Sequence, residues 1–242
     1  MAEALETAIR DGAAEYGLSL PDEAIARFAR YCEILTEKNK VMNLTAISGE
    51  FDIATVHFLD SLAPLTLPCM RAPLDGARLL DVGSGAGLPG LPLRIAAPEL
   101  GVTLLDAHGK RVAFLEELCR ALDIRDAVCV HARAEEFART SARDSYDFVI
   151  SRAVAKLNVL CELCLPLVRP GGYFIAMKSA DSDGETAGAV AAINALGGET
   201  PELYEYTVPG AGIARRLAVT RKVSATPPEY PRRFARIARD PL

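Results

Sequence analysis

The sequence is poor in the features that would place a protein in a membrane or outside the cell. No apolar run among its 242 residues reaches the ~20 residues that a helix needs to cross a bilayer. The first residues include Glu3 and Glu6, where a secretory signal would have an apolar core. We therefore expect a cytoplasmic protein without a membrane partner.

Residues that commonly bind metals are also scarce. The chain has three histidines and six cysteines, and Cys161 and Cys164 form its only C-x-x-C pair. A zinc site of that kind needs a second pair at a suitable spacing, which is missing. Both cysteines lie in an apolar helical pattern, and cytoplasmic thiols stay reduced. We expect core packing here, and no metal.

Charge is unevenly distributed. The chain has 27 basic and 32 acidic residues, a net charge of −5, which argues mildly against a general nucleic-acid-binding protein. The segment from Arg215 to Leu242 differs, because its eight basic and two acidic residues give a net +6. Such a segment is either an ordinary solvated tail or a patch that contacts phosphates.

The segment from Leu79 to Gly90 has the pattern of a buried strand, a glycine hinge and a helix start. Residues 78–82 are short and mostly apolar, as in a central parallel strand. Gly83, Gly85 and Gly87 can adopt positive φ and lack a Cβ, so the backbone there can touch a ligand. Open α/β sheets bind nucleotides at such a crevice.

The glycines fit two motifs. Gly85, Gly87 and Gly90 spell the dinucleotide-binding pattern G-x-G-x-x-G. Asp81 with Gly83, Gly85 and Gly87 spells D-x-G-x-G-x-G, the pattern of methyltransferases that bind S-adenosylmethionine. We favour the second, because Gly83 already ends the strand before the dinucleotide pattern begins.

The rest of the chain predicts two regions. Residues 2–65 have helical periodicity, and Pro64, Pro68 and Pro73 mark the passage into alternating strand and helix patterns. We therefore expect a helical extension over residues 1–68 and an α/β domain over 69–242, with a mostly parallel sheet covered on both faces. The expected strands span residues 78–82, 101–106, 127–131, 146–151, 173–178, 203–208 and 216–220. The expected helices of this domain span residues 92–97, 110–123, 158–167 and 186–196.

Several of these strands end in residues suited to ligand binding. Asp106 lies about 20 residues after the glycine loop, where a carboxylate can accept from ribose hydroxyls, although it could also cap the next helix. Ala134 and Glu135 follow the third strand and could meet an adenine edge. Arg152 follows the fourth strand and Lys178 ends the fifth, where they could bind a phosphate, a guanine edge or a cofactor carboxylate.

His57, Asp60 and Ser61 resemble a catalytic set in composition only. His57 and Ser61 are neighbours on one helix, and no oxyanion-hole motif accompanies them. We expect these residues to have a structural role or to hydrogen-bond the substrate.

A series of short motifs, in order along nearly the whole chain, resembles the bacterial 16S rRNA guanine-N7 methyltransferases, also called glucose-inhibited division protein B. The motifs are Asn39-Lys40, Asn43-Leu44-Thr45, His57-Phe58-Leu59-Asp60-Ser61, Asp81 to Gly90, Leu105-Asp106, Gly109-Lys110-Arg111, Arg133 to Phe137, Ile150 to Ala153, Tyr230-Pro231-Arg232-Arg233 and Pro241-Leu242. The chain departs from the family's pattern where Phe234-Ala235-Arg236-Ile237 replaces a segment rich in glycine and proline.

The resemblance implies a class I, Rossmann-like methyltransferase with a seven-stranded sheet and an N-terminal helical extension. It implies S-adenosylmethionine as cofactor and N7 of guanine 527, in the 530 loop of 16S rRNA or the small ribosomal subunit, as acceptor. The cofactor contacts carried over from the family are Gly83, Leu88, Ala134, Glu135 and Arg152. The glycine loop and the strand position add Gly85, Gly87 and Asp106.

We expect the RNA to contact four basic residues, which are Arg152, Lys178, Arg232 and Arg233. No catalytic base is expected, because guanine N7 has a lone pair and no proton to lose. We expect a monomer. Three alternatives remain: a methyltransferase for a small molecule or protein, a nicotinamide dehydrogenase, and a non-catalytic RNA-binding assembly factor.

Overall fold

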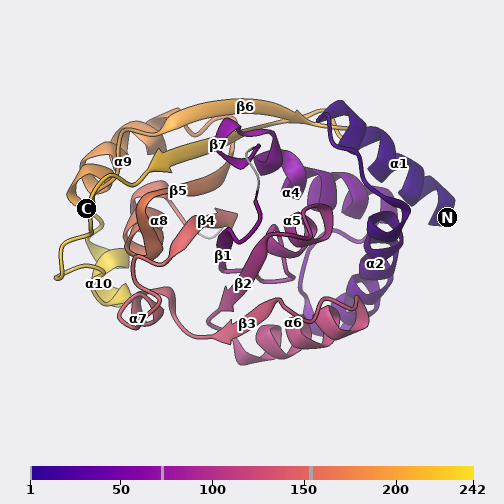
Figure 1. The fold of residues 1–242 in the computed structure, drawn as a ribbon, viewed down its shortest axis with the longest axis horizontal. Coiled ribbons are helices and arrows are strands. Elements are labelled where there is room, and N and C mark those ends of the chain that lie inside the picture. Colours follow the sequence, from indigo (N-terminus) through magenta and orange to yellow (C-terminus); the bar gives the residue numbers. More distant parts are fainter. Residues whose placement is uncertain (1, 72–73, 153–154) are drawn as a thin grey trace.

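A twisted seven-stranded sheet forms the centre of the molecule in the computed structural model, which describes residues 2–71, 74–152 and 155–242 (Figure 1). Its strands lie in the order β3-β2-β1-β4-β5-β7-β6. All neighbouring strands pair in parallel except β7, which is antiparallel to both β5 and β6. The strands are β1 (Arg78–Val82), β2 (Gly101–Asp106), β3 (Val128–His131), β4 (Tyr146–Arg152), β5 (Val168–Ser179), β6 (Glu202–Val208) and β7 (Ile213–Arg221).

Helices cover both faces of the sheet (Figure 1). Helices on one face are α1 (Ala2–Glu15), α2 (Asp22–Met42), α5 (Gly90–Ala96) and α6 (Gly109–Ala121). The other face carries α8 (Leu157–Cys164), α9 (Asp183–Ala195) and α10 (Phe234–Arg239), with α7 (Ala134–Phe137) against α8. Short helices are α3 (Glu50–Asp52), the π-helix η1 (Ile53–Leu59), α4 (Asp60–Leu62), and the 3₁₀ turns η2 (Ala63–Thr66), η3 (Pro68–Met70) and η4 (Leu165–Leu167).

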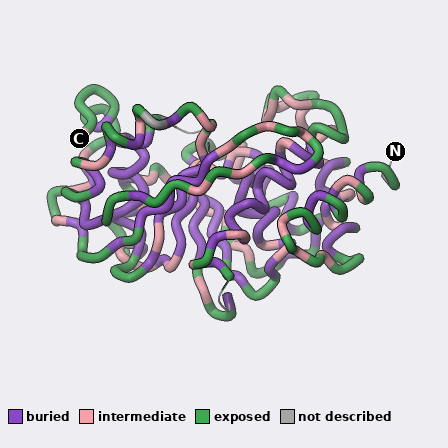
Figure 2. The backbone as a smooth tube through the Cα atoms, turned by 90° about the horizontal axis from the view of Figure 1, so that it is seen from above, coloured by how far each residue is buried: buried purple, intermediate pink, exposed green. Residues whose placement is uncertain are grey.

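Alternation along each strand creates two cores, because successive side chains point to opposite faces. On β1, Leu79 packs with the N-terminal helices, whereas Leu80 packs with α8. On β5, Ile175 and Phe174 divide in the same way. The buried stretches therefore run through the middle of the molecule and the exposed ones lie outside (Figure 2).

The N-terminal helices share a core with the sheet. Phe28, Tyr31 and Leu35 of α2 are fully buried and belong to the same apolar cluster as Leu115 of α6. The division into residues 1–68 and 69–242 stays a prediction. No helix in the described residues is long and apolar enough to cross a membrane.

The expected strands and the mostly parallel sheet are confirmed, and β2 has the expected bounds. Strand β5 was predicted to begin at Tyr173 but begins at Val168, because Pro170-Gly171-Gly172 forms an irregularity within the pairing with β4. Helix α5 begins two residues before the expected start. Helix α10 was not predicted.

Candidate active site

The glycine loop after β1 adopts the backbone that the sequence predicted. Gly83, Gly85 and Gly87 have φ of 79°, 56° and 97°, in the left-handed region that favours glycine. The backbone N–H groups of Gly83 and Ser84 donate to the carbonyl of Leu105 in β2, at 2.8 and 3.1 Å. The loop is thus held over the carboxyl end of the sheet.

Gly85, Gly87 and Gly90 differ in what surrounds them. A Cβ on Gly85 would meet only the Gly83 carbonyl, at 3.8 Å, so Gly85 faces open space. A Cβ on Gly87 would lie 2.7 Å from the Tyr31 hydroxyl, so this position needs glycine to pack against α2. A Cβ on Gly90 would come within 2.6 Å of Leu104, so the third glycine of the dinucleotide pattern serves helix–strand packing.

Asp106 connects the glycine loop to the end of β2. Its side chain is 2% exposed, and Oδ2 accepts the backbone N–H of Gly85 at 3.0 Å. Oδ1 accepts the backbone N–H of His108 at 2.8 Å, just before α6. The N-cap of α6 is His108, so Asp106 holds the turn before the helix and is not its cap. The contact with a ribose stays a prediction.

Asp81, in β1 just before the glycine loop, is fully buried. Its Oδ2 accepts the Gly90 N–H at 2.9 Å, whereas Oδ1 has no hydrogen-bond partner among the described residues. Burial raises the pKa of Asp81 to about 7, although the Gly90 N–H and the Arg152 charge lower it. An unpartnered buried carboxylate oxygen is suited to a cationic or hydrogen-donating ligand.

The other expected cofactor residues lie near the same edge. Leu88 is buried in the loop and packs in the N-terminal core. Ala134 begins α7 directly after β3, and Glu135 beside it is 8% exposed. Their contact with a cofactor stays a prediction.

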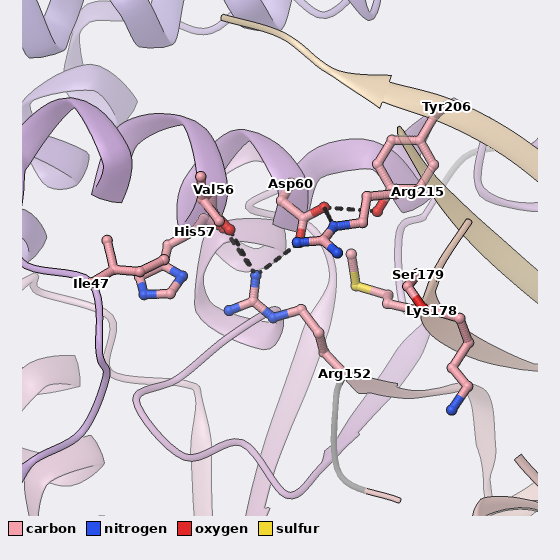
Figure 3. A pocket seen from close by; sticks show the side chains of 10 residues that line it. Ile47, Val56, His57, Asp60, Arg152, Lys178, Ser179, Tyr206 and Arg215 are labelled. Carbon is pink, nitrogen blue, oxygen red and sulfur yellow. Dashed lines mark hydrogen bonds and ion pairs between the residues drawn. The ribbon is translucent and has the colours of Figure 1, made fainter. Parts of the chain in front are cut away.

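A cavity of about 400 Å³ opens at the ends of β4 and β5 (Figure 3). It lies between the sheet and the π-helix η1, and residues of β6 and β7 close its far side. Its lining residues are Ile47, Val56, His57, Asp60, Arg152, Met177, Lys178, Ser179, Tyr206 and Arg215.

Asp60 organises this cavity. The Arg152 guanidinium donates to Asp60 Oδ2 at 3.1 Å, and the Tyr206 hydroxyl donates to Oδ1 at 2.8 Å (Figure 3). Arg215 lies 3.9 Å from the same carboxylate. Burial and the Asp60 charge raise the pKa of Tyr206, so its hydroxyl remains a donor. Asp60 therefore has a structural role, one of the two that we expected, and a hydrogen bond to the substrate stays a prediction.

His57 forms one wall of the cavity as a neutral imidazole. Burial, aided by the nearby Arg152 charge, lowers its pKa to about 4. Its Nε2 lies 2.7 Å from the Thr45 hydroxyl, and its backbone carbonyl accepts the Ser61 hydroxyl at 2.5 Å. The side-chain amide of Asn39 holds Thr45 at two points, because Nδ2 donates to the Thr45 carbonyl and Oδ1 accepts the Thr45 N–H. The sequence motifs around Asn39 and Thr45 thus position His57.

The expected RNA-binding residues differ in their surroundings. Lys178 pairs with Glu185 at 2.6 Å and donates to the Ala155 carbonyl at 2.9 Å. The Arg232 guanidinium donates to both carboxylate oxygens of Glu162, at 2.6 to 3.1 Å, and Glu162 is fully buried. Arg233, beside it, is exposed. The roles of all four predicted residues in RNA binding stay predictions, but Arg232 is clearly also an internal anchor.

Much of the basic C-terminal segment is paired within the fold. Lys222 is fully buried and contacts Asp144 and the Leu165 carbonyl. Arg216 pairs with Glu205 at 2.7 Å. The surface charge of the segment is therefore smaller than its composition suggests.

The cysteine pair lies in the core. Cys161 and Cys164 of α8 are fully buried in an apolar cluster, where burial raises the pKa of both thiols. No group of three or more metal-binding side chains is found within residues 2–71, 74–152 and 155–242.

Sequence reasoning missed three contributors to the site: Tyr31, Tyr206 and Glu162. Glu162 left a signal, since it is a charged residue inside an otherwise apolar helix and such a residue needs a partner. Tyr31 and Tyr206 left none, because their partners are 55 and 146 residues away along the chain.

The strand order, the single antiparallel strand and the glycine loop after β1 define the fold of class I methyltransferases. A solved structure with this fold is the predicted O-methyltransferase Atu636 from Agrobacterium tumefaciens. Its TM-score is 0.53 and its identity 19%, over 71% of this chain and 82% of that chain.

Sequence comparison identifies the family. The profile described as rRNA small subunit methyltransferase G matches residues 24–207. "Ribosomal RNA small subunit methyltransferase G" of Alkaliphilus oremlandii is 40% identical over 98% of this chain and 99% of its own length. The protein of the same name from Ligilactobacillus salivarius is 43% identical over 96% and 97%. The chain belongs to the rRNA small subunit methyltransferase G family.

Proposed function

We propose that this protein transfers a methyl group from S-adenosylmethionine to N7 of a guanine in 16S rRNA, at guanine 527 in the 530 loop. The observation that carries the proposal is the glycine loop of a class I methyltransferase beside a cavity lined by cationic side chains. Membership of the family supports an rRNA acceptor. The choice of N7 and of this guanine follows the sequence resemblance.

The residues of the loop fit the cofactor. The open space at Gly85 allows close approach of a ligand to the backbone, and the free oxygen of buried Asp81 can accept from a cationic amino group. Gly83, Gly87, Leu88, Asp106, Ala134, Glu135 and Arg152 complete the expected contact set. When bound, S-adenosylmethionine supplies an electrophilic methyl group.

The cavity suits an acceptor that needs no deprotonation. Asp60 is occupied by Arg152 and Tyr206, and His57 is neutral and bonded to Thr45. Neither is therefore required as a base, since the N7 lone pair is already available. The chain contributes mainly by orienting the guanine and excluding water, which lowers the barrier by holding the reactants in near-attack geometry.

The experiment is to incubate the protein with labelled S-adenosylmethionine and small subunits that lack the modification. We expect label in the 16S rRNA, recovered as N7-methylguanine after digestion to nucleosides. Label transferred without RNA, to a small molecule or a protein, would instead support the alternative methyltransferase. Confirmed cofactor binding without N7-methylguanine would reject the proposal.

A further inference from the structure

A second groove lies away from the acceptor cavity, between α7 and α10. Its volume is about 740 Å³. Both helices pack against α8, on the left of the molecule in Figure 1. Its lining residues are Arg133, Glu135, Glu136, Arg139, Arg232, Arg233, Phe234 and Ala235. Four arginines and two glutamates therefore share one hollow.

The arginines of the groove differ in whether their guanidinium groups already have partners within the protein. Arg232 is committed to Glu162, and Arg139 donates to the Pro231 carbonyl at 2.5 Å. Arg133 and Arg233 are exposed, and neither is paired with a carboxylate that the structure describes. These two guanidinium groups are available for phosphate contacts, which Arg forms well because its planar fork matches phosphate oxygens.

An aromatic ring lies among these cations. Phe234 is 40% exposed, so part of its ring is accessible to a ligand. The Arg133 guanidinium lies over its ring, 6.0 Å from the centroid. An exposed ring with adjacent cations is the combination by which proteins hold single-stranded nucleic acid, because bases stack on the ring while the cations bind the backbone.

The ring is presented on a fixed support. Ile237, one turn further along α10, is fully buried in the core. The segment before α10 is fastened by Arg143, which donates to the carbonyls of Thr226, Pro227 and Tyr230. The binding surface is therefore ordered before any partner arrives, which reduces the entropy that binding must offset.

The groove and the acceptor cavity both lie at the carboxyl end of the sheet. Helix α7 follows the carboxyl end of β3, and the cavity lies at the carboxyl ends of β4 and β5. Glu135, an expected cofactor residue, lines the groove. A strand of RNA with one nucleotide in the cavity can thus continue along this end of the sheet.

We propose that the groove between α7 and α10 binds single-stranded RNA flanking the target, with one base stacked on Phe234 and phosphates on Arg133 and Arg233. This rests on the proposed function, since it takes rRNA as the substrate. The partner is recognised by stacking and charge, so sequence preference at this site is weak.

The test uses the full-length protein and undermodified small subunits. Phe234→Leu keeps apolar volume but removes the ring, and should weaken subunit binding about tenfold, whereas Phe234→Trp should bind like the wild type. Arg233→Gln should lower the slope of log affinity against log salt by about 0.7, the value for one single-stranded phosphate contact. Arg125→Gln is the matched control. Arg125 is highly exposed and lies before the amino-terminal end of β3, whereas the groove lies at the carboxyl end of the sheet.

Affinity for S-adenosylhomocysteine, measured by calorimetry, should not change in these variants. Equal subunit binding by Phe234→Leu, Phe234→Trp and the wild type would overturn the proposal. An equal reduction by Arg233→Gln and Arg125→Gln of the slope of log affinity against log salt would also overturn it. Either result could occur while the wild type still forms N7-methylguanine, so failure of the groove and failure of the proposed function are distinguishable.

Discussion

The Tyr31 hydroxyl donates to the backbone carbonyl of Ala86 across 2.5 Å, which joins the N-terminal extension to the glycine loop. Tyr31 is fully buried on α2, 55 residues before its partner. The extension therefore does more than cover the sheet, because it fixes the backbone of the expected cofactor site.

Tyr31→Phe leaves the Ala86 carbonyl buried without its donor and should lower the free energy of unfolding by about 1–3 kcal/mol. Gly87→Ala should also destabilise, since its Cβ would lie 2.7 Å from the Tyr31 hydroxyl. In the double variant that hydroxyl is gone, so we expect less destabilisation than the sum of the single effects. Urea unfolding of the four proteins measures this, and strict additivity would show that the two residues do not interact.

Gly85→Ala should reduce cofactor affinity without unfolding the protein. The new Cβ would meet no protein atom closer than 3.8 Å, so the cost to folding is the strain of φ +56°, about 1–2 kcal/mol. The methyl would occupy the open space of the loop, and we expect affinity for S-adenosylhomocysteine to fall at least tenfold in calorimetry. Gly17→Ala is the control, because Gly17 has a similar φ of +73° and open surroundings in a remote turn. Similar affinities in both variants would show that Gly85 does not face the cofactor.

Arg232→Gln should destabilise the fold by about 3–5 kcal/mol, because the buried Glu162 carboxylate loses its cationic partner and keeps only the bond from the backbone N–H of residue 232. The double variant Arg232→Gln with Glu162→Gln should recover much of the loss, since no buried charge remains. Thermal and urea unfolding measure both effects. A neutral single variant would mean that Arg232 is not an internal anchor of the fold.

His57 should make stability depend on pH. Its pKa is about 4 in the fold, lowered from 6.5, so the unfolded chain takes up a proton more readily. Its contribution is complete above pH 6.5 and is lost as pH falls toward 4. The wild type should thus lose about 2 kcal/mol more than His57→Gln between about pH 8 and about pH 5. His131→Gln, at an exposed position, is the control. Parallel pH profiles for wild type and His57→Gln would contradict the prediction.

Asp81 should make cofactor affinity depend on pH. Its pKa is raised in the fold, whereas that of His57 is lowered. Burial raises its pKa to about 7 from 3.8, so the fold holds a proton there that the unfolded chain releases, and its stabilising contribution is lost as pH rises from 3.8 through 7. A cationic ligand group at its free oxygen favours the carboxylate. Cofactor affinity should therefore increase from about pH 6 to about pH 8, and Asp81→Asn should remove that dependence. An unchanged pH dependence in Asp81→Asn would place the ligand's cation elsewhere.

Local patterns predicted the parts of the site that depend on local physics. Positive φ at Gly83, Gly85 and Gly87 follows from the lack of a Cβ, and the bounds of β2 follow from an apolar run between a glycine and Asp106. Family resemblance identified the methyltransferase fold, which the strand order confirms.

What the sequence did not predict depends on contacts between distant segments. The π-helix η1 presents the Val56 and His57 carbonyls to Arg152, 3.4 and 3.5 Å away, and its periodicity resembles that of an α-helix. The pairing of Arg232 with Glu162 was not predicted, because Glu162 lies 70 residues earlier. The start of β5 was missed because Pro170-Gly171-Gly172 normally ends an element, whereas here the Gly171 N–H pairs with the Lys222 carbonyl.

The most direct test of the central claim is to map methylation by mass spectrometry on 16S rRNA. Small subunits without the modification would be treated with the pure protein and S-adenosylmethionine, and the rRNA fragments compared with an untreated sample. We predict one added methyl group at N7 of guanine 527 in the 530 loop. A methyl group on another atom or another nucleotide, or none in the presence of bound cofactor, would contradict the account.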